Sequence, residues 1–182
     1  RCIRTIYNPF WEEDIYGLHG LFRRLSRFRN FLLGKPLDFA IDSVEEALWT
    51  AARLHHYPSG GGFLVSHRDV VMPRVTEGTA RGLFHQILLP LTEKGKHFHQ
   101  GGGYVQLRGQ RMMLEDHCEL GDVVIYDGAT VHGVQDIDPD VRMNLNTMDG
   151  RVVMFASLYR DMGDETSLSR GFAKLKNGDK SW

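Results

Sequence analysis

Hydrophobic and polar positions follow a helical spacing near the start of the chain and strand-like spacing from its middle onward. Between Trp11 and Leu33, apolar residues recur every three or four positions, which predicts an amphipathic helix with a basic outer face. A Gly-Lys-Pro sequence then ends this helix. Ser43, with Glu46 three residues later, matches a capping box and predicts a short second helix. We therefore expect residues 1–47 to form a helical segment.

From residue 48 onward, short apolar runs are separated by turns that contain glycine, a pattern typical of β-strands. We predict strands on both sides of the turn at Gly60, and over residues 84–91, 104–108, 111–114, 121–128, 130–134 and 151–159. The gaps are too short for the crossover helices of a parallel sheet. We expect a mainly β sandwich or barrel over residues 48–160, with the N-terminal helices packed outside. The polar tail, residues 161–182, is expected to be peripheral, or helical over residues 167–175.

Composition describes an ordinary globular protein. The 182 residues are 42% hydrophobic and 25% charged, so we expect one domain over residues 1–182 with a sizeable core. A net charge of −1 gives no electrostatic support for nucleic acid or an anionic membrane as a partner. No apolar run approaches the roughly 18 residues that a membrane helix needs. Cys2 and Cys118 stand far apart, which favours a reducing, cytoplasmic compartment. Because the first residue is Arg1 rather than Met, a preceding segment is left open.

The residues best suited to chemistry are two histidines and one aspartate. His67 and Asp69 stand two positions apart at the end of a predicted strand, so their side chains project from the same face. His132 follows a buried strand and a tight turn, which places it near the core. A lone buried histidine is more often a core residue than a ligand, but beside a paired imidazole and carboxylate the ligand interpretation is favoured. Two histidines and one carboxylate are the ligands of Fe(II) centres that keep open positions for O2 and a co-substrate.

Four motifs occur in one order along residues 48–160. They are Tyr57 before His67-Arg68-Asp69, then Gly101-Gly102-Gly103-Tyr104, then Gly121 to Tyr126 before His132-Gly133-Val134, then Gly150-Arg151 opening a strand. Their order and spacing resemble those of the Fe(II)/2-oxoglutarate-dependent dioxygenases, in particular the prolyl-hydroxylase-like branch. The resemblance implies a double-stranded β-helix core, the jelly-roll architecture that cupins share. It also implies that Fe(II) is held by His67, Asp69 and His132.

The same resemblance implies a binding site for 2-oxoglutarate. Its distal carboxylate is expected to bind Arg151, whose planar guanidinium suits a bidentate carboxylate. Tyr57 matches a tyrosine that lines the co-substrate pocket, and Gln86 is a lesser candidate. Arg142 is the rival anchor, because it lies ten residues after His132 and Arg151 lies 19 after it. We favour Arg151, because the segment that follows Arg142 is too polar for a core strand.

The expected function is an Fe(II)- and 2-oxoglutarate-dependent oxygenase. It would hydroxylate a C–H bond of a small metabolite, using O2 and releasing succinate and CO2, with ascorbate in a supportive role. One alternative is a hydroxylase of protein side chains, of the prolyl type. A second is a cupin-like metal-binding protein that does not use 2-oxoglutarate, with His97 and His99 as ligands, and a third is a non-catalytic binding module. The residues expected at the mouth of the site are His85, His97, His99, Gln100, Tyr104 and Arg81.

Overall fold

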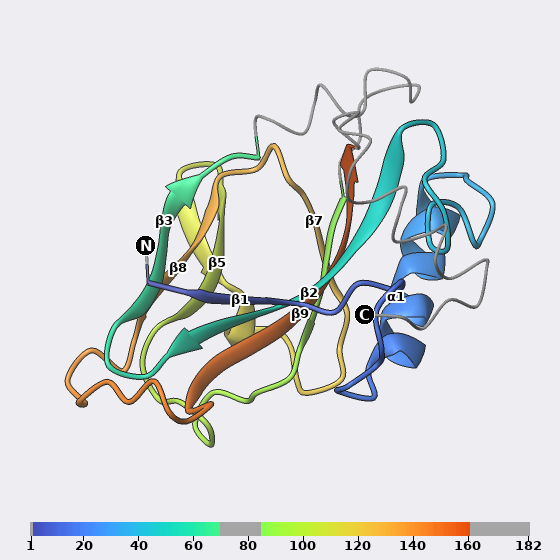
Figure 1. The fold of residues 1–182 in the computed structure, drawn as a ribbon. Coiled ribbons are helices and arrows are strands. Elements are labelled where there is room, and N and C mark those ends of the chain that lie inside the picture. Colours follow the sequence, from blue (N-terminus) through green and yellow to red (C-terminus); the bar gives the residue numbers. More distant parts are fainter. Residues whose placement is uncertain (1, 70–84, 161–182) are drawn as a thin grey trace.

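A computed structural model of the chain describes residues 2–69 and 85–160, in which strands predominate (Figure 1). The elements in chain order are β1 (Arg4–Tyr7), α1 (His19–Leu32), β2 (Leu48–Pro58), β3 (Gly62–His67), β4 (His85–Pro90), β5 (Gly102–Leu107), β6 (Gln110–Met113), the 3₁₀ turn η1 (Leu114–Asp116), β7 (Val124–Asp127), β8 (His132–Ile137) and β9 (Gly150–Arg160). The strands predicted from residue 48 onward are confirmed, with small shifts at their ends. The expected tail, its alternative helix and Arg81 lie outside the described residues.

The strands form two antiparallel sheets that face each other (Figure 1). The major sheet has the order β1-β2-β9-β4-β7, and the minor sheet has the order β3-β8-β5-β6. Strands β2 to β9 thus contribute four strands to each sheet, and consecutive strands pass between the two sheets except at the β5–β6 hairpin. This is the strand order of a double-stranded β-helix, or jelly roll, and it confirms the predicted fold class.

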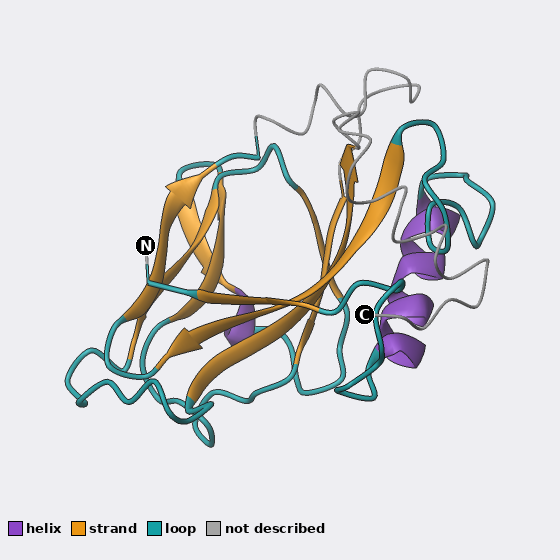
Figure 2. Ribbon diagram, viewed as in Figure 1, coloured by secondary structure: helices purple, strands orange, loops and turns teal. Residues whose placement is uncertain are grey.

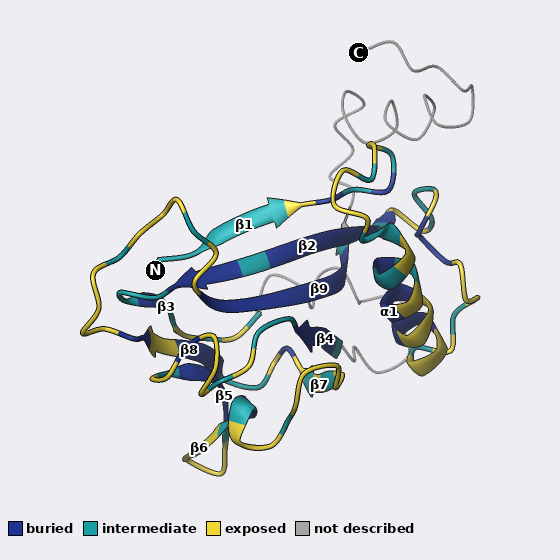
Figure 3. Ribbon diagram, turned by 90° about the horizontal axis from the view of Figure 1, so that it is seen from below, coloured by how far each residue is buried: buried dark blue, intermediate teal, exposed yellow. Residues whose placement is uncertain are grey.

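The space between the sheets is filled by side chains from alternate positions of both. β2 and β9 pair without interruption from Leu48↔Arg160 to Pro58↔Gly150, and both strands are almost wholly buried (Figure 3). Apolar side chains from both sheets and from their connecting loops form one buried cluster there. Its members are Tyr57, Leu88, Phe98, Val105, Leu114, Val134, Ile137, Val153 and Phe155. The inner face of β2 therefore carries its odd-numbered residues.

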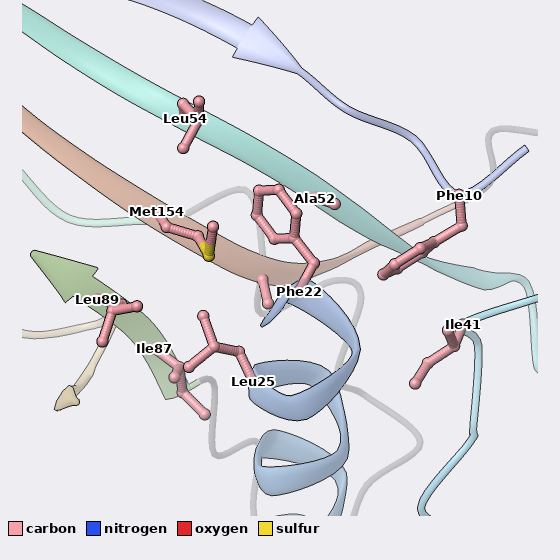
Figure 4. Packing of buried hydrophobic residues seen from close by; sticks show 10 residues of the cluster. Phe10, Phe22, Leu25, Ile41, Ala52, Leu54, Ile87, Leu89 and Met154 are labelled. Atoms are coloured by element: carbon pink, nitrogen blue, oxygen red, sulfur yellow. The ribbon is translucent and has the colours of Figure 1, made fainter. Parts of the chain in front are cut away.

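Helix α1 covers the outer face of the major sheet (Figure 2). Phe22 and Leu25 on its inner side pack against even-numbered β2 and β9 residues and against β4, including Leu54, Met154 and Ile87 (Figure 4). The opposite side of α1 is exposed (Figure 3). An amphipathic helix packed outside the core is therefore confirmed.

The predicted start of this helix, at Trp11, was wrong. α1 begins at His19, because Gly17 adopts a left-handed φ of 66° and interrupts the helical pattern. The Asp14 carboxylate accepts hydrogen bonds from the backbone N–H groups of Leu18 and His19, at 2.8 and 3.0 Å. Asp14 thus satisfies two of the donors that the start of a helix leaves unpaired.

One basic residue of α1, Arg29, is buried against the major sheet instead of lying on the basic outer face. Arg29 is 1% exposed, and its guanidinium donates to the Ala156 carbonyl, the Asn30 amide oxygen and the Thr50 hydroxyl. These neutral acceptors stabilise a cation between α1 and the major sheet. Apolar spacing alone placed this position on the polar side.

The predicted second helix was wrong. Residues 45–48 form a tight turn, in which the Glu45 N–H donates to the Leu48 carbonyl and the Leu48 N–H donates back to Glu45. Its two central residues, Glu46 and Ala47, have φ values of 51° and 57°. This is the left-handed geometry of a hairpin turn rather than a helix start. Ser43 donates to the Glu45 carboxylate instead of capping a helix.

Strand β1 was not predicted, and it lies in the segment expected to be helical. Its residues pair with β2, from Arg4↔His56 to Tyr7↔Arg53. Just before it, Cys2 pairs with Phe63 of β3, so this short stretch contacts both sheets. Figure 1 shows β1 running across the gap between them. Among the described residues, no helix is long and apolar enough to cross a membrane.

Candidate metal centre

Three potential metal ligands meet where β3 ends and β8 begins. His67 is the last residue of β3, and it pairs across the minor sheet with His132, the first residue of β8. Asp69 follows His67 by two positions, and its carboxylate lies 3.7 Å from His67 Nε2 and 3.6 Å from His132 Nε2. One ligand atom from each residue lies within 4.8 Å of the other two. The sheet register therefore brings His132 to the predicted His67–Asp69 pair.

Both imidazoles are held in the tautomer that a metal needs. His67 Nδ1 lies 2.9 Å from the Val65 carbonyl, and His132 Nδ1 lies 2.8 Å from the Thr130 carbonyl. A carbonyl only accepts, so each Nδ1 carries a hydrogen, and in the neutral ring Nε2 is then the nitrogen with the lone pair. Burial lowers the pKa of His132, which favours its neutral form. The two rings are thus oriented and prepared as nitrogen ligands.

The Asp69 carboxylate is oriented by Gln86 on β4. The Gln86 amide donates to Asp69 Oδ2 at 2.5 Å, and its oxygen accepts from the Ser157 hydroxyl at 3.2 Å. The Asp69 N–H also donates to the Gly128 carbonyl. Gln86, expected near a co-substrate, thus contacts the aspartate. Two oriented imidazoles and one fixed carboxylate suit a borderline divalent metal such as Fe(II).

A cavity of about 410 Å³ between the sheets contains all three ligands in its wall. The same cavity is lined by Tyr57 and Arg151. Arg151 is the second residue of β9, whereas Ser157, six positions later on that strand, contacts Gln86. The ligand triad and Arg151 therefore lie toward opposite ends of one cavity.

The Arg151 side chain is buried and carries a counter-charge. It is 2% exposed, and its Nε donates to the Glu115 carboxylate, whose other oxygen accepts from the Gly103 N–H at 2.8 Å. Burial alone would lower the pKa of Arg151, but Glu115 beside it raises that pKa above its ordinary value. The guanidinium is therefore charged and held in place, with its Cζ 5.5 Å from the centre of the Tyr57 ring.

Sequence analysis missed two residues of the site: Glu115, which contacts Arg151, and Arg53, which lines the cavity. Glu115 lies on η1, where no motif marked it. Arg53 lines the cavity and is 7% exposed. It lies four residues before Tyr57 on the same strand, so the period of two that brings Tyr57 inward would have found it.

The rival anchor and the loop histidines lie elsewhere. Arg142 is exposed in the connection between β8 and β9 and does not line the cavity. His97 and His99 are exposed in the connection between β4 and β5, where the backbone N–H of His99 donates to Asp138. That connection follows Pro90, which pairs with Val153 near the Arg151 end of β9. His97, His99 and the adjacent Gln100 are thus away from the triad, not at the expected mouth.

Of the other two described residues expected at the mouth, one lines the cavity. Tyr104 does so, with its hydroxyl 2.6 Å from that of Ser66. His85 opens β4 opposite Asp127, next to Gln86, but it does not line the cavity.

Comparison with known proteins finds similarity in structure but not in sequence. No protein-family model matches the chain, and no curated protein sequence matches it. Among solved structures, it is similar to a prolyl-4-hydroxylase from Pseudomonas putida, with 18% sequence identity and a TM-score of 0.48 over 87% of this chain and 71% of that one. The fold and the candidate metal centre therefore rest on the strand order and side-chain geometry of the chain itself.

Proposed function

We propose that this chain is an Fe(II)- and 2-oxoglutarate-dependent oxygenase. The observation that carries the proposal is one cavity with a two-histidine, one-carboxylate triad toward one end and a buried, charged arginine toward the other. A small dicarboxylate with a keto group matches both ends, because one end can chelate a metal while the other meets a guanidinium.

His67, Asp69 and His132 would hold Fe(II) through two neutral nitrogens and one carboxylate oxygen. When bound, Fe(II) with 2-oxoglutarate and O2 supplies the oxidising power that hydroxylates a C–H bond, with succinate and CO2 as products. Gln86 would keep the Asp69 carboxylate in its ligating orientation, which matters because such partners fix ligand geometry. Ascorbate would support turnover by keeping the iron reduced.

Arg151 would bind the distal carboxylate of 2-oxoglutarate. Its Nε is engaged by Glu115, so the two terminal nitrogens are the groups available for a ligand. Glu115 fixes the plane of the guanidinium, and Gly103 leaves space beside it, since a Cβ there would lie 2.5 Å from Arg151 Nη2. Tyr57 would form the adjacent wall. Because the guanidinium is already oriented, it loses less conformational entropy when a carboxylate binds.

A small molecule is the substrate class that the cavity supports best. Its volume of about 410 Å³ is at the small end of the range for ligand pockets. The cupin-like alternative is weakened because His97 and His99 are exposed and lie away from His132. A hydroxylase of protein side chains remains the second candidate, and the net charge of −1 gives no electrostatic support for nucleic acid as a substrate.

The decisive experiment is an anaerobic titration with Fe(II) and 2-oxoglutarate, followed by the visible charge-transfer band of the chelate. Arg151→Ala should raise the 2-oxoglutarate dissociation constant by about 30- to 1,000-fold, from the loss of a charge-assisted contact of roughly 2–4 kcal/mol. Arg142→Ala, the matched control, should change it less than about threefold, as expected for an exposed charge. If Arg142→Ala lost 2-oxoglutarate affinity and Arg151→Ala did not, the assignment of Arg151 as the anchor would be refuted.

Turnover gives an independent measurement. With Fe(II), ascorbate, O2 and 2-oxoglutarate, the purified protein should release succinate slowly even without its substrate. Bound iron and 2-oxoglutarate with no succinate from any member of a broad substrate panel would instead favour a non-catalytic binding module.

A further inference from the structure

The cavity contains a second buried arginine, Arg53, that the proposed metal and co-substrate sites do not use. It lies on the inner face of β2, in register with Phe155 of β9 and Tyr7 of β1. It is 7% exposed and lines the same cavity as the metal ligands. Its guanidinium carbon lies 4.7 Å from the centre of the Tyr159 ring and 5.5 Å from that of Phe155. The aromatic rings hold this cation in the cavity wall.

The polar contacts of Arg53 are incomplete. Its Nη2 donates to the Ser157 hydroxyl across a long 3.4 Å, and its Nε has no hydrogen-bond partner. A side-chain hydrogen bond with Tyr7 and the nearby charge of Asp69 favour the cation, but no carboxylate of residues 2–69 or 85–160 forms an ion pair with Arg53. Burying a guanidinium is costly unless its charge and its donors are matched.

The other two arginines that are buried in the described part of the chain have acceptors for their donors. Arg29 donates to one carbonyl and to two side-chain oxygens, and Arg151 donates to Glu115. Among the described residues, Arg53 has no carboxylate partner, and its hydrogen bonds with Ser157 and Tyr7 leave its Nε without an acceptor. An arginine of this kind that lines a cavity indicates a ligand that supplies the missing acceptor.

The position of Arg53 indicates which ligand that is. Ser157 contacts both Arg53 and Gln86, and Gln86 contacts Asp69, so Arg53 lies on the triad side of the cavity. Arg151, toward the other end, is already assigned to 2-oxoglutarate, whose second carboxylate belongs to the metal. A carboxylate at Arg53 would therefore come from another molecule.

We propose that Arg53 binds a carboxylate of the primary substrate, so that the oxidised molecule is a small organic acid. This inference rests on the proposed function, because it assigns 2-oxoglutarate to Arg151. The Nε and Nη2 groups lie along one edge of the guanidinium, an arrangement that a carboxylate accepts through two parallel hydrogen bonds. Binding at Arg53 would hold the rest of the acid next to the metal ligands.

Matched acid and amide probes test this site. Butyrate and butyramide have the same shape and differ in charge, and their affinities are measured by calorimetry on the full chain with Fe(II) and saturating 2-oxoglutarate under anaerobic conditions. The wild type should bind butyrate at least about tenfold more tightly than butyramide, as expected for one charge-assisted contact. Arg53→Gln should remove that preference and Arg53→Lys should retain part of it. Arg24→Gln, at an exposed position on α1, should leave it unchanged.

The affinity for 2-oxoglutarate distinguishes whether the carboxylate bound at Arg53 belongs to the substrate or to 2-oxoglutarate itself. Arg53→Gln should change it less than about threefold if the carboxylate belongs to the substrate. A large loss of 2-oxoglutarate affinity in Arg53→Gln would overturn the proposal, as would a wild-type protein with no preference for butyrate. The acid and amide titrations are repeated on metal-free protein. A wild type that binds no 2-oxoglutarate but prefers butyrate through Arg53 would refute the proposed function and keep the anion site.

Thermal unfolding gives a readout that does not depend on any ligand. Replacing an unmatched buried cation by an apolar side chain of similar size removes its desolvation cost. Arg53→Met should therefore raise the midpoint of thermal unfolding, by about 2–4 °C for a chain of this size. Arg151→Met should lower the midpoint, since that change leaves the buried Glu115 carboxylate without its counter-charge. A lower midpoint in Arg53→Met would indicate that Arg53 is a structural residue and would count against the proposal.

Discussion

Glu115 and Arg151 form an ion pair in which both side chains are nearly inaccessible to solvent, 5% and 3% exposed. Removing one member of such a pair leaves an uncompensated buried charge, which costs about 3–5 kcal/mol. We expect Glu115→Leu to lower the free energy of unfolding by about that amount in urea denaturation. The double variant with Arg151→Met should recover most of the loss.

Added 2-oxoglutarate should restore part of the stability of Glu115→Leu, because its distal carboxylate would replace the missing counter-charge. The same addition should stabilise the double variant much less. Equal stabilisation of both variants would argue against Arg151 as the anchor.

Gly103 provides a steric test of the same end of the cavity. A Cβ at this position would lie 2.5 Å from Arg151 Nη2 and 3.0 Å from its Cζ, so Gly103→Ala must displace the guanidinium. We expect a loss of 2-oxoglutarate affinity of about tenfold or more with Fe(II) affinity unchanged. Gly20→Ala is the matched control, because no atom lies within 4 Å of the position that the added Cβ would occupy. Equal 2-oxoglutarate affinities in the two variants would contradict this prediction.

The metal ligands can be separated from the other histidines by metal affinity. Alanine at His67, Asp69 or His132 should abolish tight Fe(II) binding, because two ligands rarely hold a labile divalent ion. Alanine at His97 or His99 should leave the affinity nearly unchanged, since both are exposed and away from the triad. Anaerobic equilibrium dialysis measures all five variants. If His97 and His99 proved essential for Fe(II) binding and Asp69 did not, the result would support the cupin-like alternative.

Gln86 should act on the metal through Asp69. Gln86→Leu keeps the approximate volume but removes the hydrogen bond to Asp69 Oδ2, and we expect Fe(II) affinity to fall by about 10- to 100-fold. Gln100→Leu, at an exposed position away from the triad, is the control. If both variants bound Fe(II) as the wild type does, the Gln86 contact would have no role in metal binding.

His56 should make stability depend on pH. It is buried on the outer face of β2, where Nδ1 accepts from Arg4 Nε at 2.8 Å and Nε2 lies 2.9 Å from the Asp149 carbonyl. Burial, with the Arg4 charge adding to it, lowers the pKa of His56 in the folded state. Below the unfolded-state pKa of about 6.5, the unfolded chain binds more protons, so stability falls as the pH falls. His56→Gln should lose less stability than the wild type between pH 7 and pH 5 in urea denaturation, and equal losses would exclude this role.

Features that depend on local spacing could be predicted from the sequence. Alternation identified the strands on both sides of Gly60 and placed His67 and Asp69 on one face. Arg151 was preferred to Arg142 because it opens an apolar strand, and the structure places Arg151 in the cavity wall and Arg142 outside it. These inferences needed only the period of a strand and the polarity of its neighbours.

Features that depend on long-range register could not be predicted from the sequence. β1 has four residues without clear alternation, and its pairing with β2 is visible only in the folded chain. The Glu115–Arg151 pair joins residues 36 positions apart, and nothing in either local segment indicates the other. The turn at Glu46 and Ala47 was mistaken for a helix start because a capping-box pattern does not report the sign of φ.

The position of β1 has a consequence for the order in which the fold assembles. β2 lies between β1 and β9, so β1 can pair with only one of its edges, and the other edge remains unpaired until a segment far later in the chain, Gly150–Arg160, has docked beside it. Pairings between such distant segments slow folding, and exposed strand edges invite association with other chains. During synthesis, β2 would be complete long before its main partner leaves the ribosome. We therefore expect this strand to be the main site of misfolding when the chain is produced rapidly.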